Sequence, residues 1–177
     1  QTFYIGNKKM PVVERGEGVY LYDEEGKKYF DASSGPITCN IGHANPKVLE
    51  AIKNQSEKVC FASHAFFENR PNRDLAKSLV NLTGNKYDQA FFVSGGSEAI
   101  EASFKLSKQY ALACGQTKKH KIVARAPSYH GSTMGAFSAS DDSEMKDNFQ
   151  SLTKVSIKVP APLSYRVPDN LKLSGTL

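Results

Sequence analysis

The sequence predicts an α/β protein with a parallel sheet, and three neighbouring patterns support this prediction. Residues 90–93 read AFFV, a short and wholly apolar run that is typical of a strand buried on both faces. Residues 121–125 read KIVAR and predict a second strand. Between them, helical spacing aligns a stripe of small and apolar residues: Ala99, Ala102, Leu106, Tyr110 and Ala113. Strand, helix and strand in this order form a βαβ unit, in which the two strands run parallel.

A β-hairpin is expected in the N-terminal part of the chain. The stretches 19–22 and 28–30 are rich in tyrosine and apolar residues, as strands often are. They flank the turn 23–26, which ends in Gly26, a residue that tolerates positive φ. Much later in the chain, Val155, Ile157 and Val159 alternate with polar residues and predict a further strand.

Two helices are expected between the hairpin and the βαβ unit. Asn45 followed by Pro46 predicts a helix start, with an N-cap and a proline at the first helical position. The apolar face of this helix is expected to continue as far as Val59. A second helix is predicted from about residue 72 to residue 82, with Gly84 as its C-terminal cap.

Composition and charge narrow the class of protein. With 177 residues, 40% hydrophobic and 23% charged, the chain has the composition of an ordinary folded protein. The net charge of +5 comes from scattered basic residues that form no single stripe, so no nucleic-acid partner is expected. No apolar run approaches the ~18 residues of a membrane helix, so no membrane partner is expected either.

The cysteines indicate a reducing compartment. Cys39, Cys60 and Cys114 are widely spaced and odd in number, and no C-x-x-C pair occurs, which argues against zinc or any other structural metal site and against a disulfide framework. A cytoplasmic location is therefore expected. Because the sequence starts at Gln1 without a methionine, an organelle leader before that residue stays an open alternative.

The stretch Ser94-Gly95-Gly96-Ser97 lies where the first predicted strand leads into the helix. Two adjacent glycines let backbone N–H groups at a helix start approach an anion closely, and Ser97 adds a hydroxyl donor. Phosphate is the natural anion at the carboxyl edge of a parallel sheet. The alternative is that Gly95 and Gly96 serve only the packing between strand and helix and bind no anion. Neither G-x-x-x-x-G-K-[ST] nor G-x-G-x-x-G is present, so the two familiar nucleotide loops are set aside.

The second predicted strand ends at the same edge of the sheet and is followed by residues 128–133, SYHGST. A phosphate site beside the aromatic Tyr129 and the imidazole of His130 suits a planar, phosphorylated ring. Pyridoxal phosphate fits that description. The alternative is that Tyr129 is an ordinary tyrosine of a surface loop and His130 an ordinary histidine of a turn, with no ligand role.

The chain resembles the N-terminal portion of the class III aminotransferases, pyridoxal-phosphate enzymes of fold type I. Four stretches carry the resemblance in the family's order: VYLYDEEGKKYFDASSG, GHANPKVLEAI, SGGSEAIEASFKLSKQY and SYHGSTMGAFSAS. The resemblance implies that residues 1–60 belong to the family's small domain. It also implies that residues 61–177 begin the large domain, whose parallel or mixed sheet holds the cofactor.

The resemblance also implies roles for individual residues. Gly96 and Ser97 would hold the cofactor phosphate, with Gly95 giving room. Tyr129 would stack on the pyridine ring and His130 would lie beside it. Ser34 and Gly35 match a turn that borders the family's substrate pocket.

The activity that the resemblance implies is transfer of an amino group from an amine or an (omega-)amino acid to a keto acid, by a homodimer. The Schiff-base lysine lies in a later part of the family's sequence, so no catalytic residue is assigned, and the 177 residues alone are expected to be inactive. An aminomutase or racemase of the same fold would share every motif. A non-catalytic remnant that binds a phosphorylated ligand is a further alternative.

Overall fold

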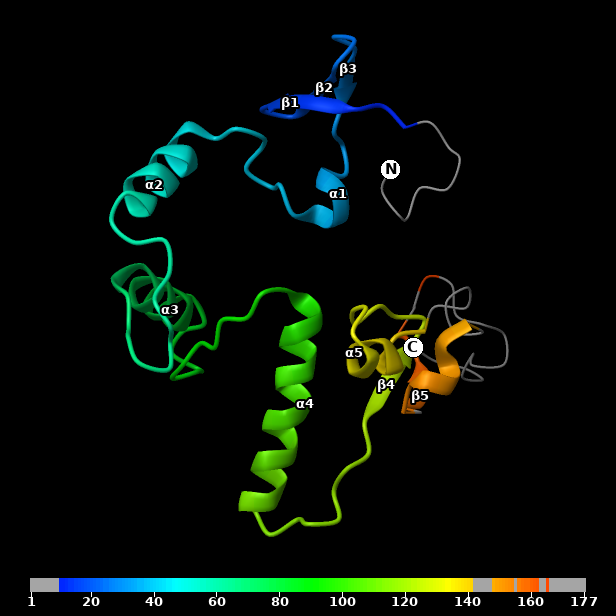
Figure 1. Ribbon diagram of the computed structural model, residues 1–177. Coiled ribbons are helices and arrows are strands. Elements are labelled where there is room, and N and C mark those ends of the chain that lie inside the picture. The colour runs from blue at the N-terminus through cyan, green and yellow to red at the C-terminus, as the bar shows by residue number, and fades with distance from the viewer. Residues whose placement is uncertain (1–9, 142–147, 155, 163–164, 166–177) are drawn as a thin grey trace. The chain divides into compact units, whose positions relative to one another are not determined.

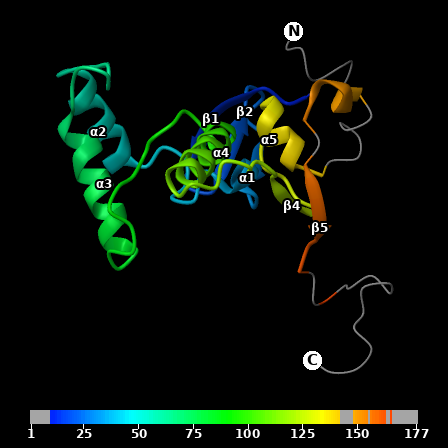
Figure 2. The ribbon, with the colours of Figure 1, turned by 90° about the horizontal axis from the view of Figure 1, so that it is seen from below.

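The computed structural model describes residues 10–141, 148–154, 156–162 and 165. The chain divides into two compact units, Gln1–Leu75 and Ala76–Leu177, which are considered separately below. Figure 1 colours the elements from blue to red along the chain, and Figure 2 gives a second view. The domain boundary that the sequence predicts after residue 60 concerns the complete family fold and stays a prediction.

The first unit begins with a three-stranded antiparallel sheet in the order β1-β2-β3. The strands are β1 (Val13–Glu17), β2 (Tyr20–Asp23) and β3 (Lys28–Phe30). Strands β2 and β3 form the predicted hairpin, whereas the sequence pattern did not reveal β1. The buried Asp23 closes the turn, because its carboxylate accepts backbone N–H bonds from Glu25 and Lys27 and the hydroxyl hydrogen of Tyr29.

Two helices follow the sheet in this unit. The short α1 (Ser34–Ile37) is kinked, with Gly35 at φ 62° and ψ −131°. Helix α2 (Pro46–Ser56) starts as predicted, since the Asn45 side chain accepts hydrogen bonds from the first-turn N–H groups of Lys47 and Val48. The expected continuation to Val59 is wrong. Helix α2 ends at Ser56, although the N–H of Val59 still bonds to the carbonyl of Gln55 four positions earlier.

Helix α3 (Arg70–Leu82) confirms the second predicted helix. Its end is a Schellman motif, in which the N–H of Asn85 bonds to Val80 O and the N–H of Gly84 bonds to Asn81 O. Gly84 adopts φ +66°, which explains the glycine at this position.

The second unit contains a two-stranded parallel sheet, β4 (Val123–Ala126) beside β5 (Ile157–Pro160), with Val123 opposite Ile157. Its helices are α4 (Gly96–Ala113), α5 (Met134–Ala139) and the short 3-10 helix η1 (Gln150–Leu152). The predicted strands near 121–125 and 157–159 are therefore present, and they pair in parallel with each other, whereas the sequence predicted the parallel pairing between residues 90–93 and 121–125. Val155 lies outside the described residues. Helix α5 contacts both α4 and β4.

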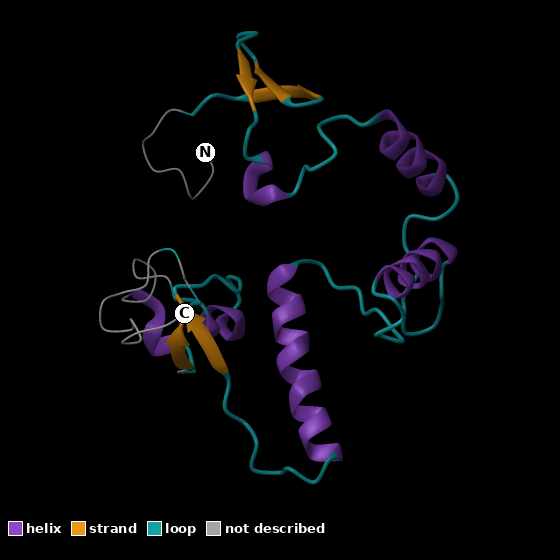
Figure 3. Cartoon of the chain, turned by 180° about the vertical axis from the view of Figure 1, so that it is seen from behind, coloured by secondary structure: helices purple, strands orange, loops and turns teal. Residues whose placement is uncertain are grey.

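The strand predicted at residues 90–93 is not formed. These residues lie in the connection between α3 and α4, which Figure 3 draws as loop. An extended segment becomes a strand only by pairing with another one, and none of the strands in the described part of the chain pairs with it. The predicted βαβ unit consequently lacks its first strand, and Phe91 remains 75% exposed.

Small residues make up the described core. The buried apolar side chains are Ala111, Ala124, Ala136 and Ala139, which come from α4, β4 and α5. Large side chains on the same elements stay exposed: Leu106 is 66% and Tyr110 is 70% exposed. Alanine allows close approach of α5 to its neighbours, while the longer apolar side chains of α4 are left without cover by the described residues.

Candidate cofactor site

Helix α4 begins with backbone N–H groups that have no hydrogen-bond partner in the described part of the chain. Its N-cap Gly95 is extended, with φ −171° and ψ 177°, and offers no capping side chain. The first helical bond of the backbone runs from Ala99 N to Gly95 O at 3.1 Å. The N–H groups of Gly96, Ser97 and Glu98 therefore bond to no other group among the described residues. A Cβ placed on Gly96 would meet nothing within 4 Å, so the space in front of this helix end is open. Such a helix end attracts anions through its free N–H groups and its dipole.

The loop after β4 lies directly against this helix end. The backbone N–H of Ser132 donates a 3.0 Å hydrogen bond to Oγ of Ser97. Gly131 makes the approach possible, because a Cβ there would stand 2.9 Å from the Cα of Ser97. The structure thus brings together the two segments, 94–97 and 128–133, that the sequence singled out.

Glu101 holds the same two segments together one helical turn further along α4. Its Oε1 accepts hydrogen bonds from the Thr133 hydroxyl at 2.7 Å and from the backbone N–H groups of Gly135 at 2.9 Å and Ala136 at 3.2 Å. The Thr133 hydrogen bond, followed by those from the two backbone groups, lowers the pKa of this carboxyl below its ordinary value. Sequence reasoning missed Glu101. Its spacing of four residues from Ser97 puts both on one helix face, a signal that was available.

Tyr129 and His130 have different environments in this loop. The Tyr129 side chain is 73% exposed, and its hydroxyl lies 3.2 Å from Oγ of Ser132. The N–H of His130 donates to Oγ of Ser140 at 2.8 Å. Nε2 of His130 is buried and has no hydrogen-bond partner among the described residues. The ring of Tyr129 is therefore accessible to a ligand, whereas Nε2 of His130 is buried.

Ser34 and Gly35 belong to the first unit, so the structure does not place them relative to α4. Within that unit their turn is well fixed. The N–H of Ser34 donates to Oδ1 of Asp31 at 2.8 Å, and the Ser34 hydroxyl donates to the carbonyl of Cys39 at 3.3 Å.

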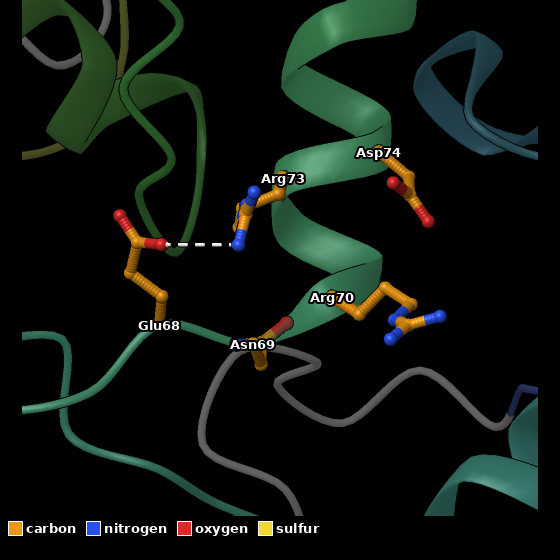
Figure 4. Close-up of a pocket in the computed structure, with 5 residues that line it drawn as sticks. All are labelled: Glu68, Asn69, Arg70, Arg73 and Asp74. Atoms are coloured by element: carbon orange, nitrogen blue, oxygen red, sulfur yellow. Dashed lines mark ion pairs between the residues drawn. The ribbon is translucent and has the colours of Figure 1, made fainter.

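The first unit also has a surface hollow of about 460 Å³ at the start of α3, shown in Figure 4. It is lined by Glu68, Asn69, Arg70, Arg73 and Asp74. Its ion pair, Arg73 to Glu68 at 3.6 Å, joins two side chains that are 71% and 77% exposed, so it contributes little stability. None of the residues predicted as site residues lines this hollow.

Comparison with known proteins identifies the family. The model of the family described as Aminotransferase class-III matches residues 4–174. The chain belongs to the class III aminotransferases. This confirms the resemblance seen in the sequence, the α/β fold type I and the dependence of the family on pyridoxal phosphate.

Relatives of this class III aminotransferase chain include the protein called uncharacterized aminotransferase YodT of Bacillus subtilis strain 168. It is 41% identical over 157 residues, which make up 89% of this chain and 35% of that protein. The adenosylmethionine-8-amino-7-oxononanoate aminotransferase of Methanocaldococcus jannaschii is 36% identical over 88% of this chain and 34% of its own length.

Solved structures give the same result. The crystal structure of the Methanocaldococcus jannaschii enzyme superposes with a TM-score of 0.81, covering 88% of this chain and 35% of that one. The omega transaminase from Pseudomonas jessenii in complex with PMP gives a TM-score of 0.83 at 28% identity, over 89% of this chain and 35% of that one. The class III chain thus spans about 35% of the length of the proteins that it matches.

Proposed function

We propose that the protein acts as a pyridoxal-phosphate-dependent aminotransferase, which moves an amino group from an amine or an (omega-)amino acid to a keto acid. Family membership supports this proposal, as do the names of the relatives, which include acetylornithine aminotransferases and an omega transaminase. These relatives differ in amino donor. The proposed substrate class is therefore a primary amine whose carbon carries a removable hydrogen.

The start of α4 is the proposed phosphate site. Gly96 and Ser97 supply free N–H groups there, and the glycine at residue 95 keeps side-chain bulk away. Since Oγ of Ser97 accepts the N–H of Ser132, its own hydroxyl hydrogen remains available for donation to a phosphate oxygen. Donors fixed in this way suit a bound phosphate because they need little reorganisation when it binds.

Tyr129 is the proposed ring contact. Its exposed side chain belongs to the loop that Ser97 and Glu101 hold against α4, so an aromatic face is available near the phosphate site. His130 would lie beside the ring, with its backbone fixed by Ser140. When bound, pyridoxal phosphate withdraws electrons from the carbon that carries the amino group, which makes the proton on that carbon removable.

The turn at Ser34 and Gly35 is proposed to border the substrate. Asp31 accepts the N–H of Ser34 and so helps to hold this turn in place. The proposed domains are residues 1–60 and residues 61–177.

The cysteines are free, in keeping with a reducing compartment, and we place the protein in the cytoplasm. In the described part of the chain, no helix is both long and apolar enough to cross a membrane.

A homodimer is the proposed assembly. Large apolar side chains such as Leu106 and Tyr110 are exposed along α4, and contact with a second copy of the protein would cover side chains of this kind. Sedimentation of the protein at its natural length, at micromolar concentration, is expected to give a dimer. A monomer under these conditions would contradict the proposal.

The hydrogen bond between Ser132 and Ser97 is the observation that carries the proposed function, because it joins an anion-binding helix end to an aromatic loop. The test is an amino-donor assay on the protein at its natural length with added pyridoxal phosphate. Without a keto acid acceptor, keto product should stop at about one equivalent per active site; with an acceptor, turnover should continue and give keto product and new amino acid in equal amounts. Return of the amino group to an isomer without an acceptor would support an isomerase instead, and no turnover would contradict both.

A further inference from the structure

Cys39, His43 and Asp31 form a cluster in the first unit that the proposed transamination does not use. The Sγ atom of Cys39 lies 3.4 Å from Nδ1 of His43, and Nε2 of His43 lies 2.8 Å from Oδ2 of Asp31. The order is thiol, imidazole, carboxylate, which is the arrangement of a nucleophile, a base and the group that orients the base.

The carboxylate determines the roles of the imidazole nitrogens. An ionised carboxylate only accepts hydrogen bonds, so Nε2 must carry the hydrogen and donate it to Asp31. In the neutral ring Nδ1 is then the acceptor, and the thiol of Cys39 donates to it. The bond to His43 is the leading reason that the pKa of Asp31 lies below its ordinary value, which keeps the carboxylate ionised at neutral pH.

His43 and Asp31 are both held in place by other parts of the unit. The backbone of His43 pairs with Gly18, with His43 N to Gly18 O at 2.7 Å and Gly18 N to His43 O at 3.1 Å. The imidazole packs against Gly16, where a Cβ would stand 2.7 Å from Cβ and Cγ of His43. Asp31 is fixed in turn by the N–H of Ser34. The His43 side chain is 22% exposed and the Asp31 side chain is 13% exposed, so the pair is largely but not completely shielded from solvent.

From this geometry we infer that Cys39 is a nucleophilic thiol and a modification site for α,β-unsaturated carbonyl compounds, with His43 as its base and Asp31 as the residue that positions the base. In the reaction Sγ passes its proton to Nδ1 of His43 and forms a bond to the β-carbon of the ligand. The π electrons of the double bond move to the α-carbon, which takes the proton back from His43. No group leaves, and no oxidant is needed.

The chain contains its own comparison thiols. Cys60 and Cys114 are exposed, whereas Cys39 is only partly accessible. Cys60 donates to the carbonyl of Ser56 at 3.4 Å and has no imidazole partner among the described residues. If accessibility alone set the rate of modification, both of these thiols would react faster than Cys39.

The experiment uses N-ethylmaleimide, an α,β-unsaturated dicarbonyl compound, on the protein at its natural length. Labelling is quenched at successive times, and the labelled fraction of each cysteine is measured by peptide mapping. Cys39 should react faster than Cys60 and Cys114 by about tenfold or more, since a positioned base contributes factors of this size or larger. A Cys39 rate equal to or below that of Cys60 would overturn the inference without the use of any variant.

Asp31→Asn tests the positioning residue. Because the N–H of Ser34 occupies Oδ1 of Asp31, the new amide would turn its NH₂ group toward His43. Nε2 would become the acceptor and Nδ1 would carry the hydrogen, so the ring could no longer take a proton from the thiol. The Cys39 rate should fall about tenfold or more, while the Cys60 and Cys114 rates stay the same.

Asp23→Asn is the matched control, because Asp23 is a second well-bonded carboxylate of the same unit, and its hydrogen bonds come from Glu25, Lys27 and Tyr29. It should leave the Cys39 rate unchanged. Equal slowing by both substitutions would assign the effect to general loosening of the unit and overturn the inference, as would an Asp31→Asn protein that reacts at the native rate.

Discussion

The N–H of Ser132 donates a hydrogen bond to the hydroxyl of Ser97 at 3.0 Å, across 35 positions of sequence. This bond places an aromatic loop beside the free N–H groups of a helix start. Glu101 reinforces it with three accepted hydrogen bonds one turn further along the helix. The loop and the helix therefore form one binding surface, and the following substitutions test how it is built.

Gly131→Ala should destabilise the second unit. Gly131 has φ +133°, and a Cβ there would stand 2.9 Å from Cα of Ser97, so the loop must either strain or move. Strain and overpacking of this kind cost roughly 1–3 kcal/mol. The free energy of unfolding in urea is the measurement.

Gly115→Ala is the control for Gly131→Ala. Gly115 also has positive φ, +73°, but a Cβ there would meet nothing within 4 Å. Both variants carry backbone strain, and only Gly131→Ala adds the clash with Ser97. Equal losses of stability would mean that the contact between the loop and α4 contributes nothing.

Glu101→Gln should change the dependence of stability on pH. Hydrogen bonds lower the pKa of Glu101 in the folded protein below its ordinary value near 4.5. The stability from its carboxylate is therefore present above that value and is lost as the pH falls through the folded-state pKa. The variant carries no ionisable group at this position, so its melting temperature should fall less between neutral pH and the acid range.

Glu98→Gln is the control for the loss of a carboxylate from α4, since Glu98 lies in the first turn of the same helix. It leaves the hydrogen bonds of Glu101 to the loop in place, so it should lower the melting temperature at neutral pH less than Glu101→Gln does. If Glu101→Gln shows the same acid sensitivity as the unaltered protein, Glu101 does not hold the loop as an ionised carboxylate.

Tyr129→Ala should weaken binding of pyridoxal phosphate and shift the absorption band of the cofactor, whereas Tyr129→Phe should keep most of both. Stacking is worth on the order of 1 kcal/mol beyond buried area, so the loss in Tyr129→Ala should be about fivefold in affinity. Phe lacks only the hydroxyl, whose partner at 3.2 Å is Ser132. Equal damage from both substitutions would assign the role to the hydroxyl rather than to the ring.

The sequence predicts local features well where the signal is local. The N-cap at Asn45, the glycine after α3 and the turn closed by Gly26 all depend on neighbouring residues, and the structure confirms them. The run at 90–93 shows the limit of this reasoning. Its apolar residues match a buried strand, but strand formation depends on a partner that local sequence does not specify.

In the candidate site, too, some features depend on neighbouring residues and others on contacts between distant segments. The glycine pair before α4 and the aromatic at Tyr129 were recognisable from residue type and position. The bonds of Ser97 to Ser132 and of Glu101 to Thr133 join segments more than 30 positions apart, and no periodic pattern in a single sequence reports such a pairing. The thiol cluster at Cys39 was missed for a similar reason, because Asp31 is 12 positions from His43.

The most direct test of the account is a titration with pyridoxal phosphate of three proteins at their natural length: the unaltered protein, Ser97→Ala and Ser107→Ala. Ser107 is an exposed serine of the same helix that lies away from the proposed phosphate site, so its substitution controls for the loss of a hydroxyl from α4. A hydroxyl bond to a charged group is worth roughly 1.5–3 kcal/mol. The dissociation constant should therefore rise by about one to two decades in Ser97→Ala and stay unchanged in Ser107→Ala. An unchanged dissociation constant in Ser97→Ala would contradict the claim that the start of α4 holds the cofactor phosphate.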